Sequence, residues 1–389
     1  MAIFSGMNGY LKSFKRALPV CLTLAFPLSA TAQNWDWTTE VADTSGRSMS
    51  LAADSEGNVH LSYGASSEGL KYGFRPAGER SHWFTMPLGG SVNYTALTLD
   101  PQENPHICST YLSFPLRYAH YDGKRWNIQE IAPEDNMSVQ AACSVAVSRD
   151  GTPHLSWYRL PMNNPEYKHM RYAVQKNGVW LMRTLDFDMQ TGKWNTMLID
   201  PQGNPCISYD AFVKGLLKFA CWDGKNWRID VVDSRGAHGS DYSLGMGSSL
   251  AFDANGNAHI SYYSDTEIRH AWQDGGKWKI ETVEKIRPTG GFLDYRSSIV
   301  FDRDGFPHIS YEDNGVAKHA YWDGKQWYVQ VIATTGTSAS RFSSMTIDRK
   351  HNTLYLAYLD AVDSSLKVAV GHKLEQPQTA RGEKETGKN

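Results

Sequence analysis

The stretch Ser248–Val283, SSLAFDANGNAHISYYSDTEIRHAWQDGGKWKIETV, contains a pattern that recurs along the whole chain. Its frame is an apolar run, an Asp-x-x-Gly turn, the sequence Pro/Ala-His-Ile-Ser-Tyr, a short turn, and a segment that ends in Trp-Asp-Gly-Lys-x-Trp or a variant of it. The histidine of the frame, or its substitute, recurs about every 46 to 53 residues, at His60, His106, His154, Cys206, His259, His308 and Tyr355. The closing tryptophan falls at Trp83, Trp126, Trp180, Trp227, Trp278 and Trp327. A repeat of this length is typical of propellers and other repeat arrays.

Each copy contains four short runs in which apolar and polar residues alternate, separated by turn sequences such as Asn314-Gly315 and Asp323-Gly324. Alternation with a period of two predicts strands, and Asn-Gly or Asp-Gly between them predicts antiparallel hairpins, because these residues tolerate positive φ. Each copy is therefore expected to form a four-stranded meander. Such a unit cannot bury both of its faces alone, and it is typical of a propeller blade.

The chain contains seven first halves of the frame but only six closing strands. The last copy stops near Val368–Val370, and the missing strand is supplied by Asn34–Val41 near the other end of the chain. We therefore predict an all-β fold over residues 33–372, a seven-bladed β-propeller of four-stranded antiparallel blades whose last blade is closed by the N-terminal strand. Closure of this kind would remove exposed sheet edges.

Composition and targeting signals limit the possible partners. The net charge of the 389 residues is -2 and 21% of them are charged, which favours neither nucleic acid nor an acidic membrane as partner. Residues 1–32 have the basic start, apolar run and Ala30-Thr31-Ala32 end of a secretory signal. A lipoprotein anchored at Cys21 is disfavoured because the apolar run continues past it. We expect a secreted or periplasmic monomer without a membrane span, ending in a disordered polar tail at residues 373–389.

Four cysteines remain after the signal, in a compartment that permits disulfides. Cys206 replaces the frame histidine, and Cys221 stands where another copy has Tyr321. These two positions face each other across a hairpin, so we predict a disulfide between Cys206 and Cys221, worth roughly 3 kcal/mol in the chain-entropy account. Cys108 and Cys143 lie in neighbouring blades, and the sequence leaves their pairing open.

The repeated polar residues have a structural explanation. A histidine at one frame position in most blades is placed by the fold, and the Asp-x-x-Gly turns at Asp54, Asp200, Asp253 and Asp302 lack the dense oxygen ligands and terminal Glu of a calcium loop. Aspartate at the start of a β-turn explains these turns better. We therefore expect no metal and no cofactor.

A ligand site is expected where the blades differ, because loops on a rigid scaffold carry function. The connections from one blade to the next are unequal, and those at Asp233–Ser248 and Glu284–Ser297 are long. These connections deliver cations and aromatic residues to the rim of the central channel, at Arg47, Tyr94, Lys193, Trp194, Tyr295, Arg296 and Arg341 with Phe342. Such a rim suits an anionic sugar, because Arg binds carboxylates in bidentate fashion. The alternative is a solvated rim whose charges pair with loop acids such as Asp186, Asp188, Asp241 and Asp294.

Catalytic candidates are fewer. His238 and Tyr242 lie in the longest connection, and Tyr158, His169 and Arg171 bracket an enlarged hairpin in the third blade. A β-eliminating lyase needs a cation for the substrate carboxylate and a His or Tyr to move the proton, and either group could supply them. The sequence has no Gly-x-Ser-x-Gly, His-Glu-x-x-His or Cys-x-x-Cys motif.

These features favour a glycan-interacting propeller that recognises an acidic extracellular polysaccharide. The alternatives are a polysaccharide lyase or, less favoured, a glycoside hydrolase acting on uronate-containing glycans, and thirdly a protein-interaction scaffold.

The frame, with Ile-Ser-Tyr followed by Leu-Lys-Tyr/Phe-Ala-x-Trp-Asp-Gly-Lys-x-Trp, resembles the broad group of secreted bacterial BNR-like and sialidase-like propeller proteins. Its Trp-Asp-Gly-x-x-Trp hairpin is similar to that of propeller lectins, which bind sugars between blades. The resemblance covers about Trp35 to Val370 and implies the architecture. Sialidases open their arginine triad with Arg-Ile-Pro, which neither Arg75-Pro76 nor Arg287-Pro288 reproduces. Propeller lyases of the ulvan type carry two histidines where this chain has Gly46, Ser66, Val92 and Leu112.

Overall fold

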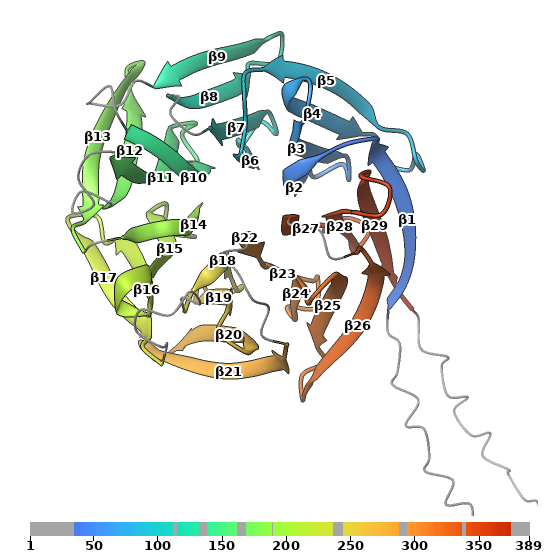
Figure 1. The fold of residues 1–389 in the computed structure, drawn as a ribbon. Coiled ribbons are helices and arrows are strands. Elements are labelled where there is room, and N and C mark those ends of the chain that lie inside the picture. The colour runs from blue at the N-terminus through green and yellow to red at the C-terminus, as the bar shows by residue number, and fades with distance from the viewer. Residues whose placement is uncertain are drawn as a thin grey trace, which may run out of the picture. The chain divides into compact units, whose positions relative to one another are not determined.

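The fold is a ring of seven blades around a central channel (Figure 1). The computed structural model describes residues 35–111, 115–131, 138–161, 169–188, 190–235, 244–287, 294–336 and 340–374. All of them belong to one compact unit, residues 33–389. In the part of the chain that is described, no helix is long and apolar enough to cross a membrane. The predicted all-β architecture of seven four-stranded antiparallel blades is therefore present.

Each blade is a meander whose first strand lines the channel and whose fourth strand lies outermost (Figure 1). The first three blades comprise β2 (Arg47–Ala53), β3 (Val59–Ala65), β4 (Gly69–Arg75) and β5 (Phe84–Gly89); β6 (Tyr94–Leu99), β7 (Pro105–Thr110), β8 (Leu116–Tyr121) and β9 (Trp126–Ile131); and β10 (Ser138–Val147), β11 (Pro153–Pro161), β12 (His169–Lys176) and β13 (Val179–Asp186).

The next three blades comprise β14 (Thr191–Ile199), β15 (Pro205–Ala211), β16 (Leu216–Trp222) and β17 (Trp227–Asp233); β18 (Met246–Phe252), β19 (Ala258–Tyr263), β20 (Glu267–Asp274) and β21 (Lys277–Lys285); and β23 (Ser298–Phe301), β24 (Pro307–Glu312), β25 (Val316–Trp322) and β26 (Trp327–Thr334). The seventh sheet contains β27 (Ser340–Asp348), β28 (Thr353–Leu359), β29 (Leu366–Lys373) and β1 (Trp35–Asp43), with β22 (Asp294–Arg296) added beside β27.

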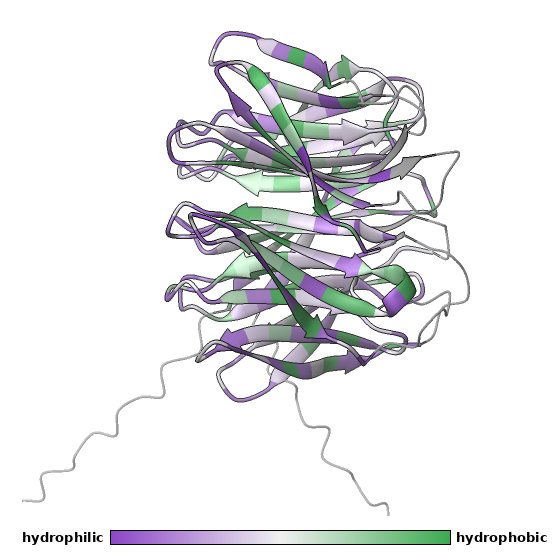
Figure 2. Cartoon of the chain, turned by 90° about the vertical axis from the view of Figure 1, so that its left-hand side faces the viewer, coloured by the Kyte–Doolittle hydropathy of each residue, from purple (hydrophilic) through white to green (hydrophobic). Residues whose placement is uncertain are grey.

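The meander gives the ring two different faces. The Asp-x-x-Gly turns and the hairpins before the fourth strands lie on one face, which we call the turn face. The connections between blades and the turns between second and third strands lie on the opposite face, the loop face. Figure 2 shows the ring from the side, with both edges of the blades visible. Lys373, at the end of β29, bonds to Asp302 and Asp304 of a turn, so the chain leaves the last strand at the turn face.

The recurring histidine joins strands within a blade. In the sixth blade His308 Nε2 lies 3.5 Å from Asp302 Oδ2 of the turn, and its Nδ1 lies 2.8 Å from Nε2 of His319 in the third strand. His60 and His106 make the same two kinds of contact, with tyrosine as the third-strand partner. Burial lowers the pKa of His308, which favours its neutral form. The repeat of this residue is explained by the fold.

An acid at the end of each of several fourth strands binds the next blade. Asp186 accepts hydrogen bonds from Tyr209 Oη at 2.9 Å and from Lys218 Nζ at 2.7 Å. The tyrosine is that of the His-Ile-Ser-Tyr frame. Equivalent groups are Asp43 with Tyr63 and Lys71, Asp233 with Tyr262 and Arg269, and Glu284 with Tyr311 and Lys318. These contacts account for the Tyr and the Lys or Arg of the frame.

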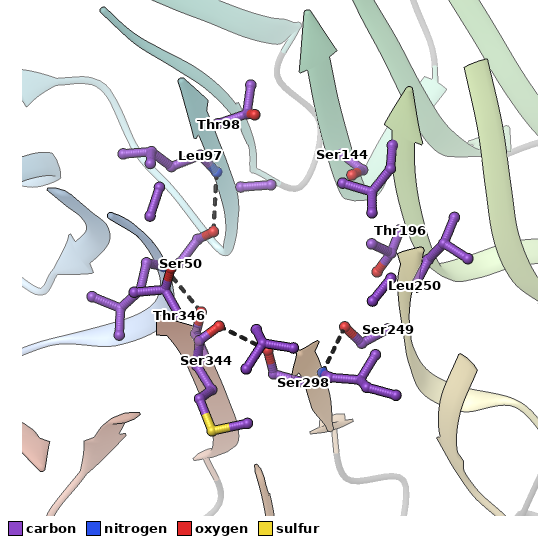
Figure 3. A pocket seen from close by; sticks show the side chains of 18 of the residues that line it. Ser50, Leu97, Thr98, Ser144, Thr196, Ser249, Leu250, Ser298, Ser344 and Thr346 are labelled. Atoms are coloured by element: carbon purple, nitrogen blue, oxygen red, sulfur yellow. Dashed lines mark hydrogen bonds between the residues drawn. The ribbon is translucent and has the colours of Figure 1, made fainter. Parts of the chain in front are cut away.

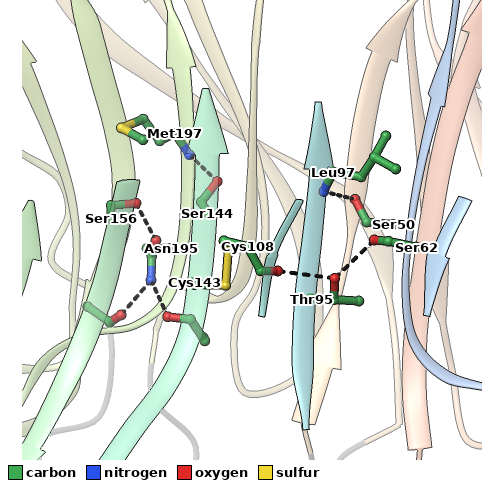
Figure 4. The surroundings of a disulfide bond; sticks show 12 residues. Ser50, Ser62, Thr95, Leu97, Cys108, Cys143, Ser144, Ser156, Asn195 and Met197 are labelled. Carbon is green, nitrogen blue, oxygen red and sulfur yellow. Dashed lines mark hydrogen bonds between the residues drawn. A yellow bond between two sulfur atoms is a disulfide. The ribbon is translucent and has the colours of Figure 1, made fainter. Parts of the chain in front are cut away.

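The serine of the frame binds the first strand of the next blade, and one seam differs (Figure 4). Ser156 donates to Asn195 at 2.7 Å, and Thr95 donates to Ser62 at 3.0 Å. The same positions carry hydroxyl pairs at three more seams, Ser208 with Ser248, Ser261 with Ser297 and Ser310 with Ser343. Between the second and third blades both positions are cysteine, and a Cys108–Cys143 disulfide replaces the hydrogen bond. The pairing that the sequence left open is thus a covalent link between blades.

The second disulfide lies within a blade. Cys206 and Cys221 are directly opposite each other in β15 and β16, with 4.0 Å between their Cα atoms, and they are joined in the structure.

The strand β1 lies antiparallel to β29, from Trp35 opposite Lys373 to Asp43 opposite Leu366. The Trp37 indole meets His319 of the preceding blade edge-on, with ring centroids 5.0 Å apart, as Trp327 meets His270 at 5.5 Å. Trp37 therefore occupies the place of the closing tryptophan. Trp35 is an additional buried ring against His308.

Candidate functional site

The channel is a cavity of about 880 Å³ enclosed by the first strands of all seven blades. Figure 3 shows that small hydroxyl side chains from these strands point toward it. Several of them also bond to the neighbouring strand: Ser50 Oγ accepts from the Leu97 amide at 3.1 Å, and Ser344 Oγ accepts from the Leu51 amide at 2.9 Å. Charged residues line the cavity at Asp54, Arg296, Arg349 and Lys350. The wall thus combines hydroxyl and apolar side chains and carries few charges.

The short strand β22 lies near the centre of the ring (Figure 1) and pairs in parallel with β27. Its position is fixed by backbone contacts. Ser297 donates from its amide to the Gly247 carbonyl at 3.0 Å, and Ser343 Oγ donates to the Arg296 carbonyl at 3.1 Å. Gly247 has φ +57°, and a Cβ there would lie 2.1 Å from the Tyr295 carbonyl oxygen. A glycine at this position therefore lets β22 approach the channel strands closely.

Arg296 and Tyr94 meet at the loop-face end of the channel. The guanidinium carbon of Arg296 lies 5.6 Å from the centroid of the Tyr94 ring, within the range of a cation–π interaction. Tyr94 begins the first strand of the second blade, whereas Arg296 lies between the fifth and sixth blades. Two of the predicted rim residues from distant parts of the chain are thus brought together, and Arg296 also lines the channel.

The other predicted rim residues differ in exposure. Arg47 is exposed at the start of β2, and Lys193 Nζ lies 4.0 Å from the centroid of the Trp194 ring. Trp194 and Tyr295 are each only 3% exposed and share an apolar cluster with Met246 and Tyr263. Their ring faces are covered, contrary to the expectation of open stacking surfaces, because β22 packs down on this cluster. Arg341 and Phe342 belong to β27, where Arg341 lies opposite Tyr295; their side chains are outside the described part of the structure.

Two of the loop acids, Asp186 and Asp188, bind lysines. Asp186 binds Lys218, and Asp188 binds Lys214 and Lys218 at 2.9 and 2.6 Å. Hydrogen bonds from Lys214 and Lys218 keep the pKa of Asp188 below its usual range. Asp241, and the side chain of Asp294, fall outside the described residues.

Two buried acids near this end of the channel were not anticipated. Asp210 is fully buried, and burial raises the pKa of its carboxyl to about 7. Its Oδ1 accepts from the Trp194 amide at 3.1 Å, within a β-bulge that places two extra residues of β14 opposite β15. Burial likewise raises the pKa of Glu312 to about 7. Both acids directly follow the Ile-Ser-Tyr sequence, but nothing in the sequence marks them as buried.

Among the catalytic candidates that the structure describes, Tyr158 does not meet His169 and Arg171. Tyr158 lies opposite Met170, whereas Arg171 lies opposite Trp157, so Tyr158 points to the other face of the third blade from Arg171 and His169. All three side chains are at least nine-tenths buried. Burial, followed by the charge of Asp210, raises the pKa of Tyr158 above its usual value. His238 and Tyr242 lie outside the described residues, so they stay predictions.

No protein-family model and no curated protein sequence matches the chain, so the sialidase-like assignment stays a resemblance. Solved propellers are similar in fold. A fucose-specific lectin from Aleuria aurantia has a TM-score of 0.55 and 16% identity, over 78% of this chain and 99% of the lectin. The polysaccharide lyase Uly1 has a TM-score of 0.54 and 12% identity, over 84% and 90%. A protein of unknown function from Dyadobacter fermentans has a TM-score of 0.53 and 11% identity, over 88% and 100%. At these identities the likeness concerns the fold.

Proposed function

We propose that this protein is a secreted or periplasmic propeller that binds an acidic extracellular polysaccharide at the loop-face end of its channel. The observation that carries the proposal is Arg296, held by β22 at the channel mouth with its guanidinium over the Tyr94 ring. A planar guanidinium binds a carboxylate or sulfate through paired hydrogen bonds. Fixing its backbone in advance lowers the entropy lost on binding.

The charge around this mouth supports an anionic ligand. Lys193, Arg47 and Arg341 lie at equivalent positions of other blades, while the loop acids Asp186 and Asp188 bind Lys214 and Lys218 instead. The buried acids Asp210 and Glu312, with pKa values of about 7, carry only part of their charge near neutral pH. That propeller folds of this kind occur in a lectin and in a polysaccharide lyase supports a glycan as the class of partner.

The test is a glycan array that includes uronate and sulfated polysaccharides, combined with absorbance near 235 nm to detect the unsaturated product of elimination. Binding of acidic glycans without new absorbance is the expected result. New absorbance would favour the lyase, the second candidate, for which Arg296 would neutralise the substrate carboxylate. Binding of neutral glycans alone would refute the acidic preference. Failure of every glycan to bind would favour a protein-interaction scaffold.

We also infer that β1 closes the ring. Three contacts support this inference: the pairing of β1 with β29, the place of Trp37 against His319, and the bonds of Asp43 to Tyr63 and Lys71 of the first blade. In this arrangement residues 1–32 would be a removable secretion signal and residues 33–372 the folded propeller, which we expect to be monomeric.

A further inference from the structure

Phe187 is an exposed aromatic ring on the loop face, between β13 and β14. Its exposed fraction is 75%, and its centroid lies 5.8 Å from that of His169. Burying such a ring is favourable by roughly 25 cal/mol for each Å² of apolar surface removed from water. Single exposed apolar side chains are common on protein surfaces, so what distinguishes Phe187 is that the segment carrying it is held firmly.

The segment around Phe187 is held on both sides. Asp186, immediately before it, is 6% exposed and bonds to Tyr209 and Lys218. Asp188, immediately after it, bonds through its carboxylate to Lys214 and Lys218, and its carbonyl accepts from Thr191 Oγ1 at 2.9 Å. The Asp188 amide also donates to Asp186 Oδ1 at 2.9 Å. The backbone of Phe187 is therefore fixed with its ring directed to solvent.

The other blades show what this position normally carries. The same acid ends the fourth strand at Asp43, Asp233 and Glu284, and the residue after it is exposed in each case. Those residues are Thr44, Ser234 and Lys285. The fold therefore requires no apolar side chain here. Among these four equivalent positions, only the one after Asp186 carries an aromatic residue.

We propose that Phe187 is a stacking platform for a pyranose ring of the bound polysaccharide, in a subsite on the loop face at the outer end of the connection from β13 to β14. This inference deepens the proposed function and rests on it for the acidic character of the ligand. A rigid aromatic ring provides contact area with little loss of side-chain entropy. One isolated ring matches the apolar face of one sugar, whereas a protein partner would need a much larger apolar patch.

The charges next to the ring are balanced, because Lys214 and Lys218 bind Asp186 and Asp188. Lys214, whose side chain is 53% exposed, binds Asp188 beside the ring. Lys193 follows six residues later at the start of β14. A sugar on Phe187 would have Lys214 near its substituents, and its acidic character rests on the proposed site at Arg296.

The experiment uses the full chain labelled with 4-fluorophenylalanine, with the Phe187 resonance assigned from its absence in Phe187→Ala. The probes are an oligogalacturonate and, as a neutral counterpart, dextran. We expect the Phe187 resonance to shift with the oligogalacturonate. Affinity should fall roughly tenfold in Phe187→Ala, as expected if about 55 Å² of apolar ring surface leaves the interface. Phe187→Trp should retain binding.

The matched control is Val362→Ala, which removes another exposed apolar side chain, 79% exposed, from a connection on the same face. It should leave the affinity unchanged. A Phe187 resonance that moves with neither probe would overturn the subsite, whether or not the protein binds. If the Phe187 resonance shifted with dextran, or if Arg296→Ala left binding unchanged, the acidic site at the channel mouth would be refuted. The role of Phe187 in stacking on a sugar would still stand in either case.

Discussion

The Trp37 indole packs edge-on against the His319 imidazole with 5.0 Å between ring centroids, although 282 residues separate them in the chain. The Trp37 Nε1 atom also donates to Gln330 in the fourth strand of the sixth blade at 3.4 Å. The N-terminal strand is therefore held by the sixth blade as well as by β29.

We expect Trp37→Ala to lower the free energy of unfolding by at least about 2 kcal/mol, because it removes a large ring from a packed seam. Deletion of residues 34–41 should destabilise the protein further by exposing the edge of β29. Urea denaturation would measure both effects. Val41→Ser is the control, since this side chain is 52% exposed on the same strand. Equal stability of the deletion variant and the parent would refute closure by β1.

Arg296→Ala should weaken binding of an acidic polysaccharide by about 1.5 to 3 kcal/mol, the range for hydrogen bonds to charged groups. Arg341→Ala is expected to weaken it similarly. Arg228→Ala on the turn face, whose side chain is 77% exposed, is the control for the loss of one positive charge. Isothermal titration calorimetry at fixed salt would compare the three variants. If Arg296→Ala and Arg228→Ala behave alike, the site lies elsewhere, and the seams between blades near the Trp-Asp-Gly hairpins are the next place to test.

The position of β22 can be tested separately from the charge of Arg296. Gly247→Ala introduces a methyl group where the Tyr295 carbonyl oxygen would be 2.1 Å away, so β22 must move and affinity should fall. Gly275 has the same φ of +57°, but nothing lies within 4 Å of an added Cβ. Gly275→Ala therefore carries the same backbone strain without the collision. Calorimetric affinities that are equal for these two variants would contradict the role of β22.

The Cys108–Cys143 disulfide can be converted into the hydrogen-bonded pair found at other seams. The free energy of unfolding of the double variant Cys108→Ser, Cys143→Ser should be about 3 to 4 kcal/mol lower than that of the parent, as expected for a cross-link that spans 35 residues. The corresponding double alanine variant should lose more, since it also lacks the hydroxyl pair. Chemical denaturation would rank the three proteins, and a serine variant as stable as the parent would be inconsistent with the link contributing.

Peptide mapping of non-reduced protein should find Cys206 joined to Cys221.

We expect the contribution of Asp210 to the free energy of unfolding to fall as the pH rises toward neutrality. Its folded-state pKa of about 7 exceeds the unfolded value, so the folded state holds the proton more tightly. The contribution is complete at low pH and is lost as the pH rises through about 7. Buried histidines with lowered pKa values, such as His154 and His259 at about 4, give the opposite slope between roughly pH 4 and 6.5. The difference in free energy of unfolding between wild type and Asp210→Asn isolates the effect of the Asp210 carboxyl. If this difference did not change with pH, the raised pKa of Asp210 would be contradicted.

The repeat sufficed to predict the blades, because their spacing, turns and alternating residues are local features. The approach of Arg296 to Tyr94 could not be predicted, since it depends on the pairing of β22 with β27 of the seventh sheet. The burial of Trp194 likewise depends on β22, which packs on its cluster. The two-residue bulge in β14 contains Gly192, at φ +93°, and an isolated glycine within a strand pattern is a signal of such a bulge. Phe187 could have been found by comparing the residues that follow each strand-ending acid.

The chain enters β1 and leaves β29 at the turn face, where Lys373 bonds to Asp302. A surface or carrier attached beyond residue 374 would therefore hold the ring with its loop face directed away from the support. In an immobilised or displayed form, a long polymer could then lie across Arg296 and Phe187 without meeting the anchor. Attachment at the connections between blades would have the opposite outcome, since it would place the support against the mouth of the channel.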